Sequence, residues 1–290
     1  MSKLLDIFFR LSSMLPLRVH YLVADCLLYP FIYYIVGYRK RVVRRNLENA
    51  FPEKDEKERR TIERGFYHFF CDYIVETCRY YAMSEAEMKR HLVFEGIEDM
   101  ERELETRDFV FVYLGHYGNW EWISALQLYV NPAIQCAFLY RPLANKAFDD
   151  LFLNIRNRMG SESIAKNDSL RRILTMKREG KKAIIGFISD QSPRRTNIHL
   201  WVDFLSQDTP VFTGTERIAK KVNAAVYFAD VTREGRGHYR CHMRPLTSSP
   251  NDYPDYQVTE LYMKELEAMI RRNPSIWLWS HKRWKRKREG

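Results

Sequence analysis

The sequence has no C-x-x-C pair, and its five cysteines are an odd number. This pattern is typical of free thiols in a reducing compartment and argues against a disulfide framework. His68, Cys71 and Cys78 fall on one helical pattern, but their spacing matches no common zinc arrangement. We therefore expect these three side chains to pack in a core, and we expect no metal and no cofactor in the chain.

Several functional motifs are also missing. The chain has no G-x-S-x-G motif, no internal repeat, no low-complexity linker and no nucleic-acid-binding module. The absence of a serine nucleophile motif argues against a covalent enzyme intermediate. The basic clusters flank apolar or Trp-rich segments instead of forming one groove, so nucleic acid is not an expected partner.

No uncharged apolar run reaches the length of a membrane span. Residues 19–38 are apolar and aromatic but include His20 and Asp25, and their longest uncharged run is the thirteen residues from Cys26 to Tyr38. As a helix, this run is about 20 Å long, against about 30 Å for the hydrocarbon core of a bilayer. Pro30 is expected to kink it. No small-residue cleavage site follows, so a signal peptide is not expected.

Three interpretations of this segment stay open: a marginal span, an aromatic-rich helix partly within one leaflet, or a buried helix pair of a soluble protein. Residues 4–11 offer another apolar surface, and the basic cluster 39–45 follows directly. Each basic residue near anionic lipid contributes about 1 kcal/mol. We predict that residues 1–45 form a membrane-associated helical segment. By the positive-inside tendency, we expect everything after residue 38 to be cytoplasmic.

The charge of the whole chain points to anionic partners. Its net charge is +10 and its pI about 9.3, and a second basic cluster occupies residues 282–288 beside Trp284. A phospholipid, a lipid phosphate, nucleic acid or an acidic carrier protein would each complement such a charge. Aromatic residues make up 14% of the chain, and they favour both cores and membrane interfaces.

The pattern of the remaining residues predicts a single α/β domain over residues 46–290. Residues 40–92 are helical in pattern, and afterwards short apolar stretches alternate with helical ones. The predicted strands are 109–114, 134–139, 183–188, 225–231 and 238–243, and the predicted helices are 120–130, 145–159, 168–179, 213–222 and 256–272. Apolar strands separated by helices indicate a central, mostly parallel sheet flanked by helices.

Polar residues follow three of the predicted strands. His116 comes two residues after the first strand, Arg141 after the second, and Asp190 and Gln191 after the third. Active sites of open α/β sheets gather at the carboxyl ends of strands. Glu121, five residues beyond His116, is a carboxylate able to steady an imidazolium. The alternative is a satisfied loop histidine beside a glutamate at a helix start.

These motifs, taken in order, resemble the late acyltransferases of lipid A biosynthesis, within the wider lysophospholipid acyltransferase group. The resemblance rests on residues 115–121 (GHYGNWE), Tyr140-Arg141-Pro142 with Arg156 downstream, Asp190-Gln191-Ser192-Pro193, residues 204–214, and the terminal stretch 274–284. It covers nearly the whole chain. A histidine and a glutamate at this spacing are nonspecific alone, whereas the ordered set is strong.

The resemblance implies transfer of a fatty acyl chain from an acyl-carrier-protein thioester to a hydroxyl of a glucosamine-based lipid, at the cytoplasmic face of the inner membrane. His116 and Glu121 match the catalytic pair of the family. Arg141, Arg156, Asp190 and Gln191 are the expected substrate-binding residues.

The expected mechanism is direct transfer, with His116 as base and Glu121 orienting it. Backbone N–H groups of residues 115–118 or the Arg141 guanidinium are expected to stabilise the oxyanion. Another acceptor, such as an aminolipid, a glycolipid or a lysophospholipid, and a basic membrane-binding protein without catalysis are the alternatives.

Overall fold

The computed structural model describes residue 9 and residues 12–288, so most of the apolar surface predicted over residues 4–11 lies outside the described residues. A helical stretch near the N-terminus consists of α2 (Leu17–Val23), η1 (Ala24–Leu28) and η2 (Pro30–Ile35). Its turns are widened around Pro30, as the bond from Val36 N–H to the Phe31 carbonyl at 2.8 Å shows. Wide turns accommodate a proline that has no N–H to donate.

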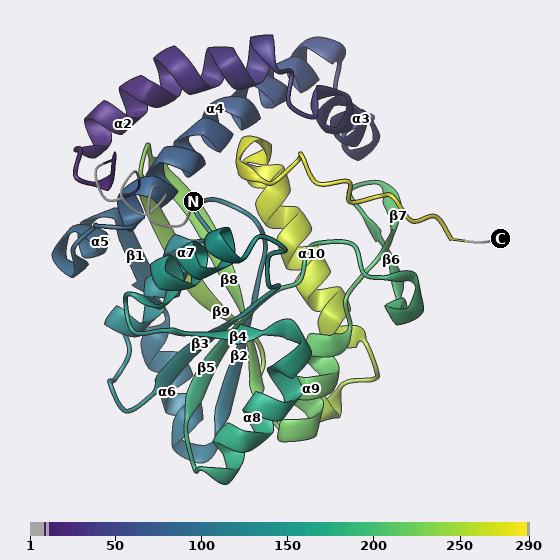
Figure 1. Cartoon of the computed structure of the whole chain (residues 1–290). Helices are drawn as coiled ribbons and strands as arrows, with labels where there is room; N and C mark the ends of the chain where they lie inside the picture. Colours follow the sequence, from purple (N-terminus) through teal and green to yellow (C-terminus); the bar gives the residue numbers. More distant parts are fainter. Residues whose placement is uncertain (1–8, 10–11, 289–290) are drawn as a thin grey trace.

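This helical stretch lies with α3 (Lys40–Ala50) and part of α4 (Glu56–Tyr80) at one end of the molecule (Figure 1). Its outward side is apolar, with exposed Leu22, Leu27, Phe31, Tyr34 and Ile35. Within the described part of the chain, no single helix has both the length and the apolar character needed to cross a membrane. Leu17–Ile35 and Lys40–Ala50 satisfy those criteria only as a pair, with a bend of 83° between them.

Helix α4 begins at a capping box. The Asp55 carboxylate accepts the backbone N–H of Glu58 at 2.8 Å, and the Glu58 carboxylate accepts that of Asp55 at 2.9 Å. Apolar residues at three- and four-residue spacing bury one side of the helix, including Ile62, Phe66 and Phe69. A short helix, α5 (Glu85–His91), follows, and the Ser84 side chain caps it by accepting the Glu87 backbone N–H. The boundary predicted at residue 45 falls inside α3.

A seven-stranded sheet forms the centre of the molecule (Figure 1). Its order is β1-β9-β8-β2-β5-β3-β4, and every neighbouring pair is parallel except β8 and β9. The strands are β1 (Leu92–Glu95), β2 (Phe109–Leu114), β3 (Gln135–Tyr140), β4 (Glu162–Ala165), β5 (Ala183–Ile188), β8 (Ala225–Gly235) and β9 (His238–Thr247). The mostly parallel α/β sheet is therefore confirmed.

Helices connect and flank these strands. They are α6 (Ile97–Thr106), α7 (Lys146–Asn157), α8 (Ser169–Arg178), α9 (Gly214–Val222) and α10 (Gln257–Arg272). A separate antiparallel hairpin, β6 (Trp201–Phe204) and β7 (Gln207–Pro210), lies beside α10 and the C-terminal stretch (Figure 1). The short apolar strand β2 is buried at every position because it lies in the middle of the sheet between β8 and β5.

The sequence missed β1, β4, β6 and β7, each of four residues, because short stretches with polar residues give little periodic signal. The helix predicted over 120–130 is wrong in type: residues Trp122–Leu128 form a 3₁₀-helix, η3. The other predicted strands and helices are found within a few residues of their expected ends.

Replacing Asp55 by alanine should destabilise the protein by about 1 kcal/mol, because the first turn of α4 loses its side-chain cap. The matched control is Asp55→Asn, whose side-chain oxygen can still accept the Glu58 N–H. Denaturant unfolding of both variants in detergent measures the difference. Equal midpoints for the two variants would contradict a capping role.

Candidate functional site

The register between two parallel strands brings the candidate site together. β2 and β5 pair so that Leu114 lies beside Ile188. Two residues further along each strand come His116 and Asp190. Because parallel strands end at the same edge of a sheet, the two side chains leave it as neighbours.

Asp190 is the carboxylate that holds the imidazole of His116. Its Oδ1 lies 2.6 Å from His116 Nδ1, and its Oδ2 accepts the backbone N–H of His116 at 2.8 Å. The indole N–H of Trp277 donates to the same Oδ2 at 2.8 Å. A carboxylate at Nδ1 favours the tautomer that leaves the lone pair of Nε2 free to accept a proton.

The environment of Asp190 keeps it ionised. Burial acts to raise the pKa of this carboxyl, but the charge of His116 and the hydrogen bonds from His116 and Trp277 outweigh burial and lower the pKa to about 2. The paired imidazole remains partly accessible, with 18% of its side chain exposed against 2% for Asp190. His116 therefore combines a fixed orientation with access to a substrate.

The Glu121 carboxylate bonds Arg156 and not the His116 ring. Its Oε2 accepts from Arg156 Nε and its Oε1 from Arg156 Nη2, each at 2.7 Å, and the Tyr73 hydroxyl lies 3.4 Å from Oε1. The expectation that Glu121 orients the His116 ring is corrected: Asp190 makes that contact. Glu121 directly precedes the 3₁₀-helix η3 without capping it through its side chain, which instead reaches Arg156 on α7.

A cavity of about 770 Å³ opens beside these groups. His116, Glu121, Arg141, Arg156 and Gln191 line it, and Asp190 bonds His116. The structure thus brings all the predicted site residues together. Much of the remaining wall is apolar and consists of Leu114, Trp120, Phe138, Leu139, Phe187, Ile188, Phe212 and Ile218.

The Gln191 side chain provides a hydrogen-bond donor beside His116 Nε2. The Gln191 amide Nε2 lies 3.2 Å from His116 Nε2. Two of the backbone donors expected to stabilise an oxyanion are already engaged: His116 N–H with Asp190, and Gly118 N–H with the Ile276 carbonyl at 3.0 Å. Gly118 has a φ of +59°, a conformation that glycine adopts without steric cost.

The sequence missed two residues of the site. Trp277, on the terminal stretch, bonds Asp190. Lys166 lines the cavity with its Nζ 3.9 Å from the centre of the Phe212 ring. Burial lowers the pKa of Lys166, and so do the neighbouring charges of Arg141 and Arg194. The sequence would have indicated Lys166 as a site residue only if the short polar strand β4, which directly precedes it, had been predicted.

In the described part of the chain, no group of three or more His, Cys, Asp or Glu side chains is arranged to hold a metal ion. The described cysteines are free thiols. Burial raises the pKa of the Cys71 thiol to about 12 and that of Cys78 to about 11, which keeps both protonated and poorly nucleophilic.

A histidine and aspartate at the strand ends of a parallel sheet, beside a deep cavity with apolar walls and a cationic side, are typical of an enzyme acting on an amphiphilic, anionic substrate. Comparison with known proteins agrees with this class. The chain belongs to the bacterial lipid A biosynthesis acyltransferase family, whose model matches residues 6–286. The protein is therefore an O-acyltransferase of lipid A biosynthesis, as its sequence motifs suggested.

Individual relatives share low sequence identity with the chain but align over most of its length. The chain is 24% identical over 249 residues to the lipid A biosynthesis palmitoleoyltransferase of Escherichia coli (strain K12), covering 85% of this chain and 79% of that protein. It is 26% identical over 258 residues to the lipid A biosynthesis lauroyltransferase of the same strain, covering 87% and 81%. A lipid A biosynthesis acyltransferase of Haemophilus influenzae is 24% identical over 279 residues, covering 90% and 86%.

The low pKa of Asp190 predicts a pH-dependent stability. Since the pKa is about 2 in the folded protein against an ordinary 3.8, ionised Asp190 stabilises the fold above about pH 4, and this contribution is lost as the pH falls toward 2. The contribution at neutral pH is on the order of 2 kcal/mol.

Denaturant unfolding of the parent and of Asp190→Asn, near neutral pH and near pH 3, measures this contribution. The gap between the two proteins should narrow at the lower pH, because asparagine does not titrate. A gap that stays constant would rule out the proposed ionisation.

Proposed function

We propose that this acyltransferase moves a fatty acyl chain from an acyl-carrier-protein thioester to a hydroxyl of a lipid A precursor, with His116 as the general base. The observation that carries the proposal is the Asp190–His116 pair, whose imidazole ring lines a cavity with apolar walls. Membership of the lipid A acyltransferase family supports the acceptor class.

The chemistry follows from the hydroxyl being a poor nucleophile until it loses its proton. His116 Nε2 takes that proton as the oxygen attacks the thioester carbonyl, and Asp190 stabilises the resulting imidazolium. Collapse of the tetrahedral intermediate breaks the carbon–sulfur bond, and the proton held by His116 passes to the leaving thiolate. The products are a new ester and the free thiol of the carrier.

The oxyanion of the intermediate needs donors that face the cavity. The Gln191 amide, already beside His116 Nε2, and the Arg141 guanidinium on the cavity wall supply them. Glu121 acts through Arg156: it fixes the guanidinium, which also lines the cavity, in a bidentate ion pair. Arg156 then serves as a substrate-binding group.

The charge around the cavity suits both substrates. Arg141, Lys166 and Arg194 lie close enough for their charges to interact, and no ion pair or hydrogen bond joins these three to a carboxylate of the described chain. An acidic carrier protein and a phosphorylated lipid are both attracted by such a group.

The exposed apolar side of the N-terminal helices is the surface that would bind the membrane. The exposed Leu22, Phe31 and Ile35 would enter the interfacial layer of the inner membrane. The basic cluster of residues 39–45 would meet anionic headgroups on the cytoplasmic side. Metal and cofactor play no part in the proposed reaction, which needs only the thioester donor.

His116→Ala should lower acyl transfer by at least about a hundredfold, since the base is removed. The assay uses purified protein, an acyl-carrier-protein thioester and a lipid A precursor. Circular dichroism and membrane recovery of the variant serve as controls for folding. Transfer by the variant at the parent rate would show that His116 is not the base.

The same variant identifies the acceptor in cells. Mass spectrometry compares the membrane lipids of a deletion strain restored with the parent gene and with His116→Ala. Loss of one acyl chain from lipid A in the variant is the expected result. Unchanged lipid A with an altered aminolipid or lysophospholipid would refute the proposed acceptor and favour another one.

A close packing contact on the cavity wall should set the acyl length. A methyl group on Gly186 would overlap Phe138 Cδ1 and lie 2.9 Å from Leu114 Cδ1. We expect Gly186→Ala to push the Phe138 ring into the cavity, so that kcat/KM for the best donor falls about tenfold relative to a donor two carbons shorter. Gly235→Ala, where an added methyl meets nothing within 4 Å, is the control. An unchanged chain-length profile would contradict an acyl-binding role for this wall.

A further inference from the structure

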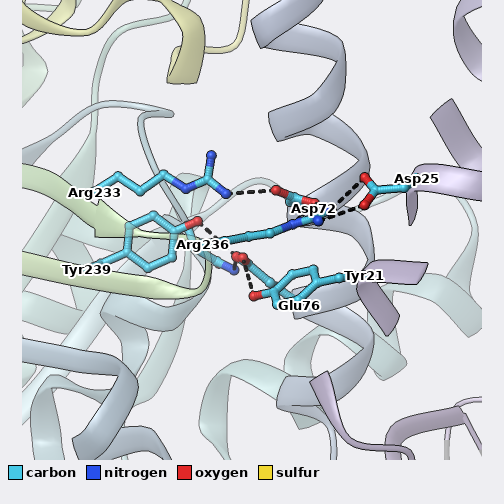
Figure 2. Close-up of polar contacts among 8 residues, drawn as sticks. Tyr21, Asp25, Asp72, Glu76, Arg233, Arg236 and Tyr239 are labelled. Carbon is cyan, nitrogen blue, oxygen red and sulfur yellow. Dashed lines mark hydrogen bonds and ion pairs between the residues drawn. The ribbon is translucent and has the colours of Figure 1, made fainter. Parts of the chain in front are cut away.

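Two carboxylates one turn apart on α4 face the N-terminal helix from inside the protein. Asp72 and Glu76 are both buried, with 3% and 0% exposure. Figure 2 shows Tyr21 and Asp25 reaching toward them from one side, and Arg233, Arg236 and Tyr239 from the other. Buried carboxylates are costly unless they are fully hydrogen-bonded, so this arrangement has a strong preference for one geometry.

Glu76 joins three separate segments of the chain. Its Oε1 accepts the Tyr21 hydroxyl at 3.0 Å, and its Oε2 accepts the Asn119 amide and the Tyr239 hydroxyl, each at 2.9 Å. Burial raises the pKa of Glu76 to about 7, although the Asn119 and Tyr239 hydrogen bonds and the charge of Arg233 act to lower it. The carboxyl therefore depends on these three donors for its solvation.

Asp72 lies one turn before Glu76 on α4 and bonds two arginines. Arg233 donates to it at 2.7 Å and Arg236 at 2.9 Å. Arg236 also donates to both oxygens of Asp25 at 2.8 Å. The hairpin of β8 and β9 thus clamps the N-terminal helix against α4, and Tyr21 is held in place over Glu76.

Asn119 is the point at which this network enters the candidate active site. It lies between His116 and Glu121, and its own side-chain oxygen accepts the Trp122 N–H at 3.3 Å. The loop from His116 to Glu121 is fixed by Asp190 at one end and by Arg156 at the other. Glu76 fixes its middle, and through Tyr21 connects it to the N-terminal helix.

The opposite side of that helix is the exposed apolar surface. Leu22 is 62% exposed and directly follows Tyr21, which bonds Glu76. Leu27 is 64% exposed and lies two residues after Asp25, which bonds Arg236. Any force that seats or displaces the helix at a membrane surface therefore acts directly on a donor to Glu76.

We propose that Glu76 is a positioning residue, which sets the His116–Glu121 loop in its reactive arrangement when the N-terminal helix is docked. The inference rests on the proposed function, because it assigns that loop to acyl transfer. It does not require Glu76 to touch a substrate. Loss of the Tyr21 hydroxyl changes how the Glu76 carboxylate holds the Asn119 amide, because both groups donate to that carboxylate.

The chain contains a matched control for this contact. Tyr33, on the same N-terminal helical stretch, donates its hydroxyl to Glu63 of α4 at 3.1 Å. Glu63 is otherwise bonded to Arg44 and paired with Arg60, not to the His116–Glu121 loop. Tyr21→Phe and Tyr33→Phe each remove one oxygen from a tyrosine–glutamate bond between the same two segments, but only the first leads to the loop.

The first measurement is hydrogen exchange of the peptide covering residues 115–121, with the full-length protein on vesicles that contain an anionic phospholipid. Tyr21→Phe and Glu76→Gln should speed exchange in this peptide, while Tyr33→Phe should leave it at the parent rate. Exchange that is unchanged in Tyr21→Phe, or raised equally in both tyrosine variants, would overturn the positioning role.

The second measurement is steady-state transfer with the carrier-protein thioester. Tyr21→Phe should lower kcat about fivefold or more with little change in KM, and Tyr33→Phe should not. In a Glu76→Gln background, Tyr21→Phe should have little further effect, whereas purely structural losses would add. If hydrogen exchange responds as expected but the parent transfers no acyl group, the proposed function fails and the coupling stands. A parent that transfers normally with no response in either readout refutes the coupling alone.

Discussion

The structure of the site depends on one buried carboxylate, that of Asp190. Its two oxygens accept from the ring and backbone of His116 and from the indole of Trp277. A charge in this position is stable only if every donor stays in place. It therefore ties together the ends of β2 and β5 and the C-terminal stretch, beside the cavity that His116 lines.

The same principle recurs around the site. Glu121 is buried and satisfied by Arg156, Glu76 by two tyrosines and an asparagine, and Asp72 by two arginines. Each of these contacts joins elements far apart in the sequence. Because an unpaired buried charge is much more costly than an exposed one, such pairs specify one arrangement of the chain. The loop from His116 to Glu121 is held in this way at three points, by partners from three different elements.

Much of the fold was predictable from local pattern. The strand Phe109–Leu114 is a run of six apolar residues, and Ala183–Ile188 is equally apolar, so both were recognised with their observed bounds. The edge strands Leu92–Glu95 and Glu162–Ala165 were not, because an edge strand is short and partly polar. The turn after Trp120 was predicted as an α-helix, yet a 3₁₀-helix forms there, and this directs Glu121 toward Arg156.

The sequence by itself determined which residues gather at the candidate site. His116, Glu121, Arg141, Arg156, Asp190 and Gln191 come in the segments after three strands, and the ends of parallel strands share one edge of a sheet. Only the tertiary structure decided which carboxylate serves the histidine. Glu121 is five residues from His116 and Asp190 is 74 residues away, yet the register of β2 with β5 brings Asp190 to the ring. Hydrogen bonds form between groups that are close in space with the right direction, and both are set by backbone geometry and long-range pairing that sequence spacing does not contain.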